Sequence, residues 1–188
     1  MLLHGFPAGP GEPVTYPAPR PDRPPTAGWR AAPARAAHDL RAVAFHEAGH
    51  AVMFLLLGVP VAHAVARSTD GALQPDWRRI GERVTTVTPA ASPDDFECAC
   101  RAASAMHAGL AAELILAGLP WHAPLLRVGT DLEMAERILE PVTGRPYCPR
   151  AHGLAQLHAL RDLSEHWREV EAVARRLMAK PGERIAFN

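Results

Sequence analysis

The stretch His46-Glu47-Ala48-Gly49-His50 decides the fold and the chemistry that this sequence predicts. Residues four positions apart lie on one face of an α-helix, so both imidazoles can reach a single metal ion. Glu47 lies off that line, where its carboxylate can take a proton from a water molecule. Two nitrogen ligands, an open position for water and a carboxylate base are the arrangement of a zinc hydrolase. The motif therefore predicts a zinc site with His46 and His50 as ligands and Glu47 as the catalytic base.

The flanking residues place this motif in the middle of a buried helix. Asp39 is a suitable N-cap, Gly58 a suitable residue after the last turn, and Pro60 prevents continuation. The helix between them is apolar on nearly all sides, which predicts burial. Buried histidine and glutamate side chains are costly unless they are paired or bound to a metal. The alternative is a pair of hydrogen-bonded core histidines beside a salt-bridged glutamate.

The composition excludes several classes of protein. The 188 residues include 20 basic and 20 acidic side chains, so nothing favours nucleic acid or an anionic membrane as a partner. Cys98, Cys100 and Cys148 form no Cys-x-x-Cys pair and indicate reduced thiols in a cytoplasmic protein. The first residues lack the pattern of a signal peptide, and polar residues interrupt the apolar stretch 42–66, so we expect no membrane span.

The first 37 residues differ in composition from the rest of the chain. They contain nine of the 19 prolines, mixed with glycine and alanine and with few large apolar residues. Such a segment buries too little surface to offset the entropy that ordering costs. We predict a Pro-rich disordered tail over residues 1–37, for which docking to a partner is the alternative role, and one compact domain over residues 38–188.

The pattern from residue 38 onward predicts a mainly α-helical domain with a small β element. Two β-branched runs predict short strands at 61–67 and 83–88, joined by a connection that contains Gly71 and Pro75. After the motif helix we expect further helices over these ranges: 93–117 with Ser92 as cap, about 130–139 ending before Pro141, and about 158–178.

A catalytic zinc site needs a third protein ligand. Spacing does not choose among the candidates, which are Glu113, Asp131, Glu133, His63, His107 and His122. Thr130-Asp131-Leu132-Glu133 also has the pattern of a capping box, so on local grounds Asp131 would be a helix-capping residue first and a ligand second. Glu113 has three open roles: a ligand, a residue that orients a ligand histidine, and a partner in a local salt bridge. We expect His107 to be an ordinary helix residue and His63 to lie on a strand near the motif, with a position lining the cleft as the alternative.

Three stretches follow one another along the chain in a characteristic order. They are the His-Glu-Ala-Gly-His-Ala segment at 46–51, Ala-Gly-Leu-Ala-Ala-Glu-Leu-Ile at 108–115, and Gly-Thr-Asp-Leu-Glu-Met-Ala at 129–135. Together they resemble the protease domain of the FtsH family of ATP-dependent zinc metalloproteases. The resemblance covers about residues 40–180.

The resemblance implies a helical zinc-metalloprotease fold of the FtsH type, with Zn²⁺ bound by His46, His50 and Asp131 and with Glu47 as the base. The family also carries a membrane anchor and an ATPase module, but this sequence has no Gly-x-x-x-x-Gly-Lys-Ser/Thr phosphate loop. We therefore expect a peptidase that is ATP-independent on its own and hydrolyses peptides or unfolded proteins. An ATPase or another protein that acts in trans is a candidate partner. The alternative is a weak or inactive FtsH-like zinc-binding domain that acts as a binding or regulatory protein. Glu47 favours the enzyme, because a scaffold needs the ligands but not the base.

Overall fold

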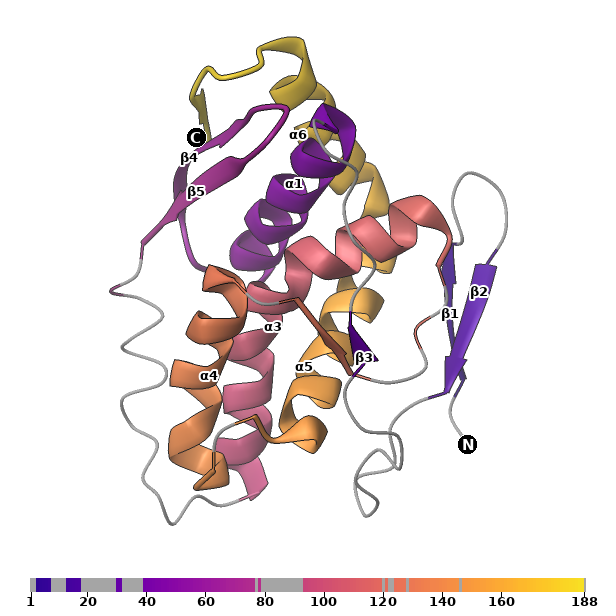
Figure 1. The fold of residues 1–188 in the computed structure, drawn as a ribbon, viewed down its shortest axis with the longest axis vertical. Helices are drawn as coiled ribbons and strands as arrows, with labels where there is room; N and C mark the ends of the chain where they lie inside the picture. The colour runs from indigo at the N-terminus through magenta and orange to yellow at the C-terminus, as the bar shows by residue number, and fades with distance from the viewer. Residues whose placement is uncertain are drawn as a thin grey trace.

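The computed structural model describes most of the chain from residue 39 onward and short segments before it. The described residues are 3–7, 13–17, 30–31, 39–76, 78, 93–119, 121, 124–127, 129–145 and 147–187. Their helices are α1 (Leu40–Leu56), α3 (Pro93–Ala117), α4 (Thr130–Thr143), α5 (Pro149–Glu165) and α6 (Trp167–Ala179). Their strands are β1 (Leu3–Pro7), β2 (Pro13–Pro17), β3 (Arg30–Ala31), β4 (Val61–Ala66), β5 (Gly71–Pro75), β6 (Leu125–Leu126) and β7 (Ile185–Ala186). The fold is mainly α-helical with a small β element, which confirms the prediction (Figure 1).

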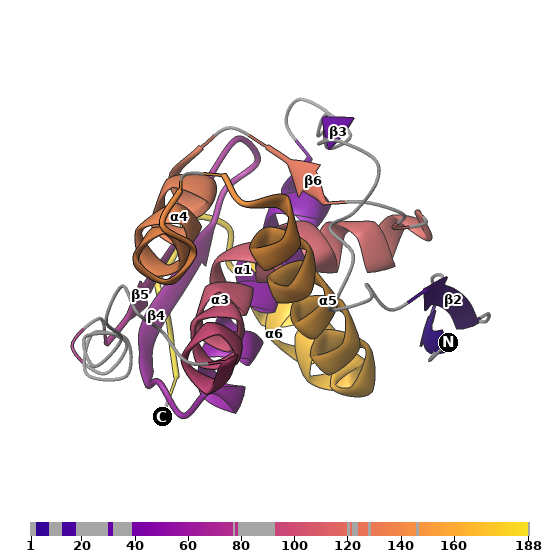
Figure 2. The same cartoon turned by 90° about the horizontal axis from the view of Figure 1, so that it is seen from below.

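Helix α1 lies at the centre of this arrangement. It packs against α3 and α6, and strands β4 and β5 cover a further side, while α3 also packs against α4 and α5. Figure 2 shows α4 and the β4–β5 hairpin on one side of α3 and α5 on the other. The all-round apolar character of α1 therefore reflects neighbours on several sides. Among the described helices, none combines the length and the apolar character needed to cross a membrane.

The sequence signals at the two ends of α1 act as predicted. The Asp39 carboxylate accepts a hydrogen bond from the Ala42 N–H at 3.0 Å, which satisfies one of the free donors of the first turn. Gly58 follows the last turn with φ of 71°, a left-handed conformation that glycine adopts at little cost. These two ends confirm that the motif lies in mid-helix.

The sheet agrees with the prediction in one strand and differs in another. Strand β4 confirms the run at 61–67, but β5 occupies the segment that we predicted to be a connection. That prediction was wrong because a tight turn, in which the Arg67 N–H donates to Asp70 O at 2.7 Å, brings Gly71 directly opposite Ala66. Strand β7 pairs with the other side of β4, which gives the order β5-β4-β7. The predicted strand at 83–88 lies outside the described residues.

Two helix ends differ from the sequence predictions. Helix α4 continues through Pro141 to Thr143, because a proline this close to the end removes only one backbone hydrogen bond. The predicted helix at 158–178 is in fact two helices that meet at His166, and the first of them begins at Pro149, a favourable first helical residue. Helix α5 packs against α3 and α6 against α1, so the apolar stripe continues while the helix does not. The second predicted helix is observed as α3, and its cap Ser92 lies outside the described residues.

Parts of the predicted Pro-rich tail pair as strands. Strands β1 and β2 form an antiparallel pair, and β3 pairs in parallel with β6, close to the start of α4. The other residues of the segment 1–37 lie outside the described residues, and for them disorder stays a prediction.

Candidate metal centre

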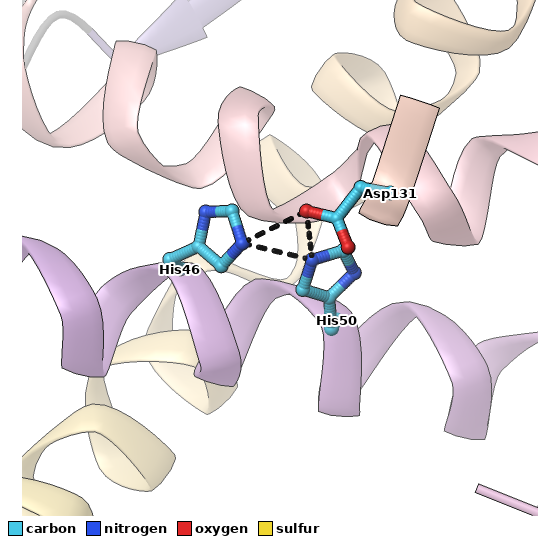
Figure 3. A group of neighbouring side chains, drawn as sticks. All are labelled: His46, His50 and Asp131. Carbon is cyan, nitrogen blue, oxygen red and sulfur yellow. Dashed lines mark hydrogen bonds and ion pairs between the residues drawn. The ribbon is translucent and has the colours of Figure 1, made fainter. Parts of the chain in front are cut away.

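Three side chains that are far apart in the sequence meet at one point. His46 and His50 lie on successive turns of α1, and Asp131 lies in the first turn of α4; Figure 3 shows both imidazoles directed at its carboxylate. The Nε2 atoms of the two histidines are 3.1 Å apart, and Oδ2 of Asp131 is 3.1 Å from the first and 3.3 Å from the second. The structure thus brings together the three residues expected to be ligands.

These distances match the spacing of ligands around a small cation. His46, His50 and Asp131 each offer one atom that can bind a metal, and these three atoms lie within 4.8 Å of one another. Among the described residues, this is the only group of three histidine, cysteine or acidic side chains that meets this distance. With metal–ligand bonds of about 2.0–2.1 Å, two atoms of a tetrahedral shell lie about 3.3 Å apart. The group could therefore hold a metal ion with only small movements of its side chains.

The two imidazoles are oriented by hydrogen bonds from their far ring nitrogens. Nδ1 of His50 donates to the backbone carbonyl of Ala105, and Nδ1 of His46 donates to Oε1 of Glu113, both at 2.7 Å. A proton on Nδ1 leaves the lone pair of Nε2 free to bind a metal, and such second contacts fix both tautomer and ring direction. Of the three roles open to Glu113, the contacts support two, because it accepts from His46 and also forms an ion pair with Arg127, and its carboxylate lies on the side of the His46 ring away from the three-atom group.

When no metal is bound, the group favours a positively charged His50 beside a negatively charged Asp131. Burial alone would lower the pKa of His50, but the carboxylates of Asp131 and Glu47 and the Ala105 carbonyl outweigh it and raise this pKa to about 9. Desolvation raises the pKa of Asp131, but the two histidines reverse the effect and hold it well below its usual range. A metal ion that binds here must displace a proton from His50, so metal affinity should rise with pH.

A glycine on α3 makes room for both imidazoles. A Cβ atom on Gly109 would lie 2.4 Å from Cε1 of His46 and 2.5 Å from Nε2 of His50. Real Cβ atoms essentially never come this close to another atom. The backbone of α3 therefore supports the two rings directly, and only glycine fits beneath them.

Glu47 lies beside the group, at the wall of a cleft. Its side chain is buried and touches Gly71 of β5, where a Cβ atom would lie 2.5 Å from the Glu47 carboxylate oxygen. The cleft encloses about 480 Å³ and is open enough to admit solvent. Its lining includes the three-residue group, Glu47, four residues of β5, and the apolar side chains of Phe54, Met106 and Met134. Glu47 thus lies next to the potential metal site, where the spacing of the motif predicts its carboxylate.

The remaining candidates for a third ligand lie elsewhere or serve another purpose. Glu133 is exposed on α4, and His63 of β4 is absent from the lining of the cleft. His107 is buried and hydrogen-bonded to His152 at 2.9 Å, and burial together with that imidazole lowers the pKa of His107 to about 3. His122 lies outside the described residues.

The predicted capping box at the start of α4 is wrong. Gly129 occupies the N-cap position, and no side chain caps the helix. Thr130 is already the first helical residue, so the Asp131 side chain is free to turn toward the imidazoles, and 47% of it remains exposed. Local sequence cannot distinguish a capping acid from one drawn away by a distant partner.

Sequence reasoning missed three residues that shape the centre. Gly71 and Gly109 act through the absence of a side chain, and nothing in the sequence marks them apart from other glycines. Arg127 contacts Glu113 from a segment whose conformation has no periodic pattern. Their roles become visible only in the folded structure, where elements that are distant in the sequence lie in contact.

Comparison with known proteins finds no relative for this chain: no protein-family model, no curated protein and no solved structure matches it. The likeness to FtsH-type proteases therefore rests on the three sequence stretches and their order. Function has to be argued from the geometry of the centre.

Proposed function

We propose that this protein is a zinc-dependent metallopeptidase with a domain of the FtsH type. The observation that carries the proposal is the position of Glu47 beside the His46–His50–Asp131 group, in a cleft bounded by a strand. A binding protein needs the three ligands, but it has no use for a carboxylate at the position next to the first of them.

The set of donor atoms favours zinc among the common metals. Two imidazole nitrogens and one carboxylate oxygen form the His₂-carboxylate set of catalytic zinc sites, which leave one position open. When bound in such a site, zinc polarises a carbonyl group and lowers the pKa of a water molecule to near 7. His46, His50 and Asp131 would hold the ion, and the contacts to Glu113 and Ala105 keep both Nε2 lone pairs directed at it.

Glu47 is the residue that moves the proton. In the proposed reaction its carboxylate accepts a proton from the attacking water and later delivers it to the amine that leaves, so that hydrolysis of the peptide bond is balanced. The bare backbone at Gly71 gives the carboxylate the space it needs to face the cleft. Glu47 is only 7% exposed, so little of its surface meets bulk water.

The cleft suits an extended peptide as the substrate. Among the described strands β5 lies at an edge of its sheet, and four of its residues line the cleft. An extended peptide can pair with the main chain of such a strand, which would align a peptide bond beside Glu47. Phe54, Met106 and Met134 offer an apolar wall to one substrate side chain. We infer that the substrates are peptides or unfolded proteins and that this domain cleaves them without ATP.

The test compares Glu47→Gln with wild type for zinc content and for cleavage of unstructured peptides. Glu47→Gln keeps the size of the side chain but cannot accept the proton, so cleavage should fall by at least about 100-fold while zinc is retained. Glu133→Gln makes the same chemical change at an exposed position of α4 and should cleave as wild type does. A wild-type protein that binds zinc but cleaves no peptide would favour a binding protein instead.

A further inference from the structure

A partly buried ion pair lies directly behind the metal centre. Nη1 of Arg127 is 2.5 Å from Oε1 of Glu113, and the same oxygen accepts the hydrogen bond from Nδ1 of His46. The side chains of Arg127 and Glu113 are 29% and 11% exposed, so solvent screens their attraction only partly. One carboxylate oxygen thus connects the guanidinium group to an imidazole of the three-residue group.

Arg127 and Asp131 belong to one short segment that reaches the centre twice. Arg127 follows strand β6, and Asp131 comes four residues later in the first turn of α4. The side-chain amide of Gln156 on α5 anchors β6 by accepting from the Leu125 N–H at 2.9 Å and donating to Leu125 O at 2.7 Å. The segment is therefore held at Leu125, and the ion pair to Glu113 attaches it again between Leu125 and Asp131.

We propose that Arg127 is a positioning residue of the metal centre. Through the ion pair it holds the Glu113 carboxylate against Nδ1 of His46, and it fixes the segment from which Asp131 reaches both imidazoles. Its effect is to raise the affinity of the site for a divalent cation. The inference rests on the proposed zinc site and adds a residue that neither the motif nor the resemblance assigns.

Removing the charge of Arg127 should change metal affinity in opposite directions for positioning and for charge repulsion. A guanidinium group near a dication repels it, so removing its charge should on that ground alone strengthen metal binding. Loss of positioning should instead weaken binding, since partners behind a ligand histidine contribute about 10–100-fold to metal affinity. The direction of the change therefore separates the two effects.

The experiment measures zinc affinity by competition with a chelator, for the full chain and for three variants. Arg127→Met removes the charge and keeps most of the side-chain length, and we expect about tenfold weaker binding. Arg127→Lys restores a charge without the planar fork and should recover most of the affinity. Arg137→Met removes one positive charge from an exposed position of α4 and should bind as wild type does.

A double substitution tests the route of the effect. If Arg127 acts through Glu113, Arg127→Met added to Glu113→Gln should weaken zinc binding by less than it does alone. Tighter or unchanged zinc binding in Arg127→Met would overturn the proposal, as would failure of this variant to fold without zinc, which would assign Arg127 to folding. A wild-type chain that binds no zinc would overturn the proposed function as well. A chain that binds zinc, loses affinity in Arg127→Met and cleaves no peptide would contradict only the proposed activity.

Discussion

Gly109→Ala offers the sharpest test of the metal centre, because it adds one methyl group beneath both imidazoles. The new Cβ would lie 2.4 Å from Cε1 of His46 and 2.5 Å from both Nε2 atoms, and ordinary contact begins at 3.4 Å. The rings would therefore have to move by about 1 Å, whereas bonds to a metal tolerate only about 0.2 Å. The atoms that must move are the ends of side chains, so the zinc-free protein can adapt while the zinc-bound one cannot.

The magnitude follows from the linkage between binding and folding. With zinc at 100 times its dissociation constant, the wild-type protein gains about 2.7 kcal/mol of stability. If Gly109→Ala weakens binding about 100-fold, the same zinc concentration equals the new dissociation constant and contributes only about 0.4 kcal/mol. The zinc-free variant should change by no more than about 1 kcal/mol, and helix propensity favours alanine over glycine.

Urea unfolding with zinc and with a chelator measures the free energy of unfolding of the zinc-bound and of the zinc-free protein. Gly49→Ala provides the contrast, because its Cβ would meet the backbone oxygen of Ala108 at 2.6 Å and the Cβ of Ala112 at 2.7 Å. Helix backbones cannot rotate away, so Gly49→Ala should cost about 1–3 kcal/mol with or without zinc. If Gly109→Ala keeps the full gain from zinc, the two imidazoles do not bind a metal in the arrangement described here.

Two further predictions concern Glu47 and the buried histidines. Gly71→Ala places a Cβ 2.5 Å from the Glu47 carboxylate oxygen, so peptide cleavage should fall at least about tenfold while zinc content stays unchanged; equal loss of both would contradict this. Burial lowers the pKa of His107 to about 3 and also lowers that of His152, whereas an unfolded histidine titrates near 6.5. At these two histidines the unfolded chain binds more protons below about pH 6.5, which outweighs the opposite contribution of His50, so the free energy of unfolding should decrease from pH 7 to pH 5, less steeply in His107→Gln.

Sequence reasoning succeeded where a physical cause acts locally. The bounds of α1 follow from Asp39, Gly58 and Pro60, each of which fixes the backbone through its own chemistry. The pairing of His46 with His50 follows from helical periodicity alone. These features depend on residues within a few positions of one another, so a single sequence contains them.

Prediction failed where two helices share one apolar pattern and where a residue has both a local and a distant partner available. The apolar stripe of α5 and α6 is continuous, but its first part packs on α3 and its second on α1, with Trp167 stacked on Phe45 at 5.4 Å. Asp131 has the local signature of a helix-capping residue, yet the attraction of two imidazoles some 80 residues earlier determines where its side chain points. In both cases the deciding energy is tertiary, so the local pattern leaves the outcome open.

Helix α3 supports the centre mostly through groups that the sequence alone does not reveal. Three of its residues, Ala105, Gly109 and Glu113, are spaced by four, so they form one row along the helix. The carbonyl of Ala105 accepts from His50, the bare backbone of Gly109 leaves room for both rings, and Glu113 accepts from His46. The acceptors for the two histidines thus lie at the ends of this row, and Gly109 lies between them beneath both rings. Of the three only Glu113 contributes a side chain that chemistry could suggest in advance, because the others act through a main-chain oxygen and a missing methyl group. A substitution of Ala105 by a residue of similar size should therefore leave its contact to His50 intact, whereas a side chain at Gly109 should displace both imidazoles.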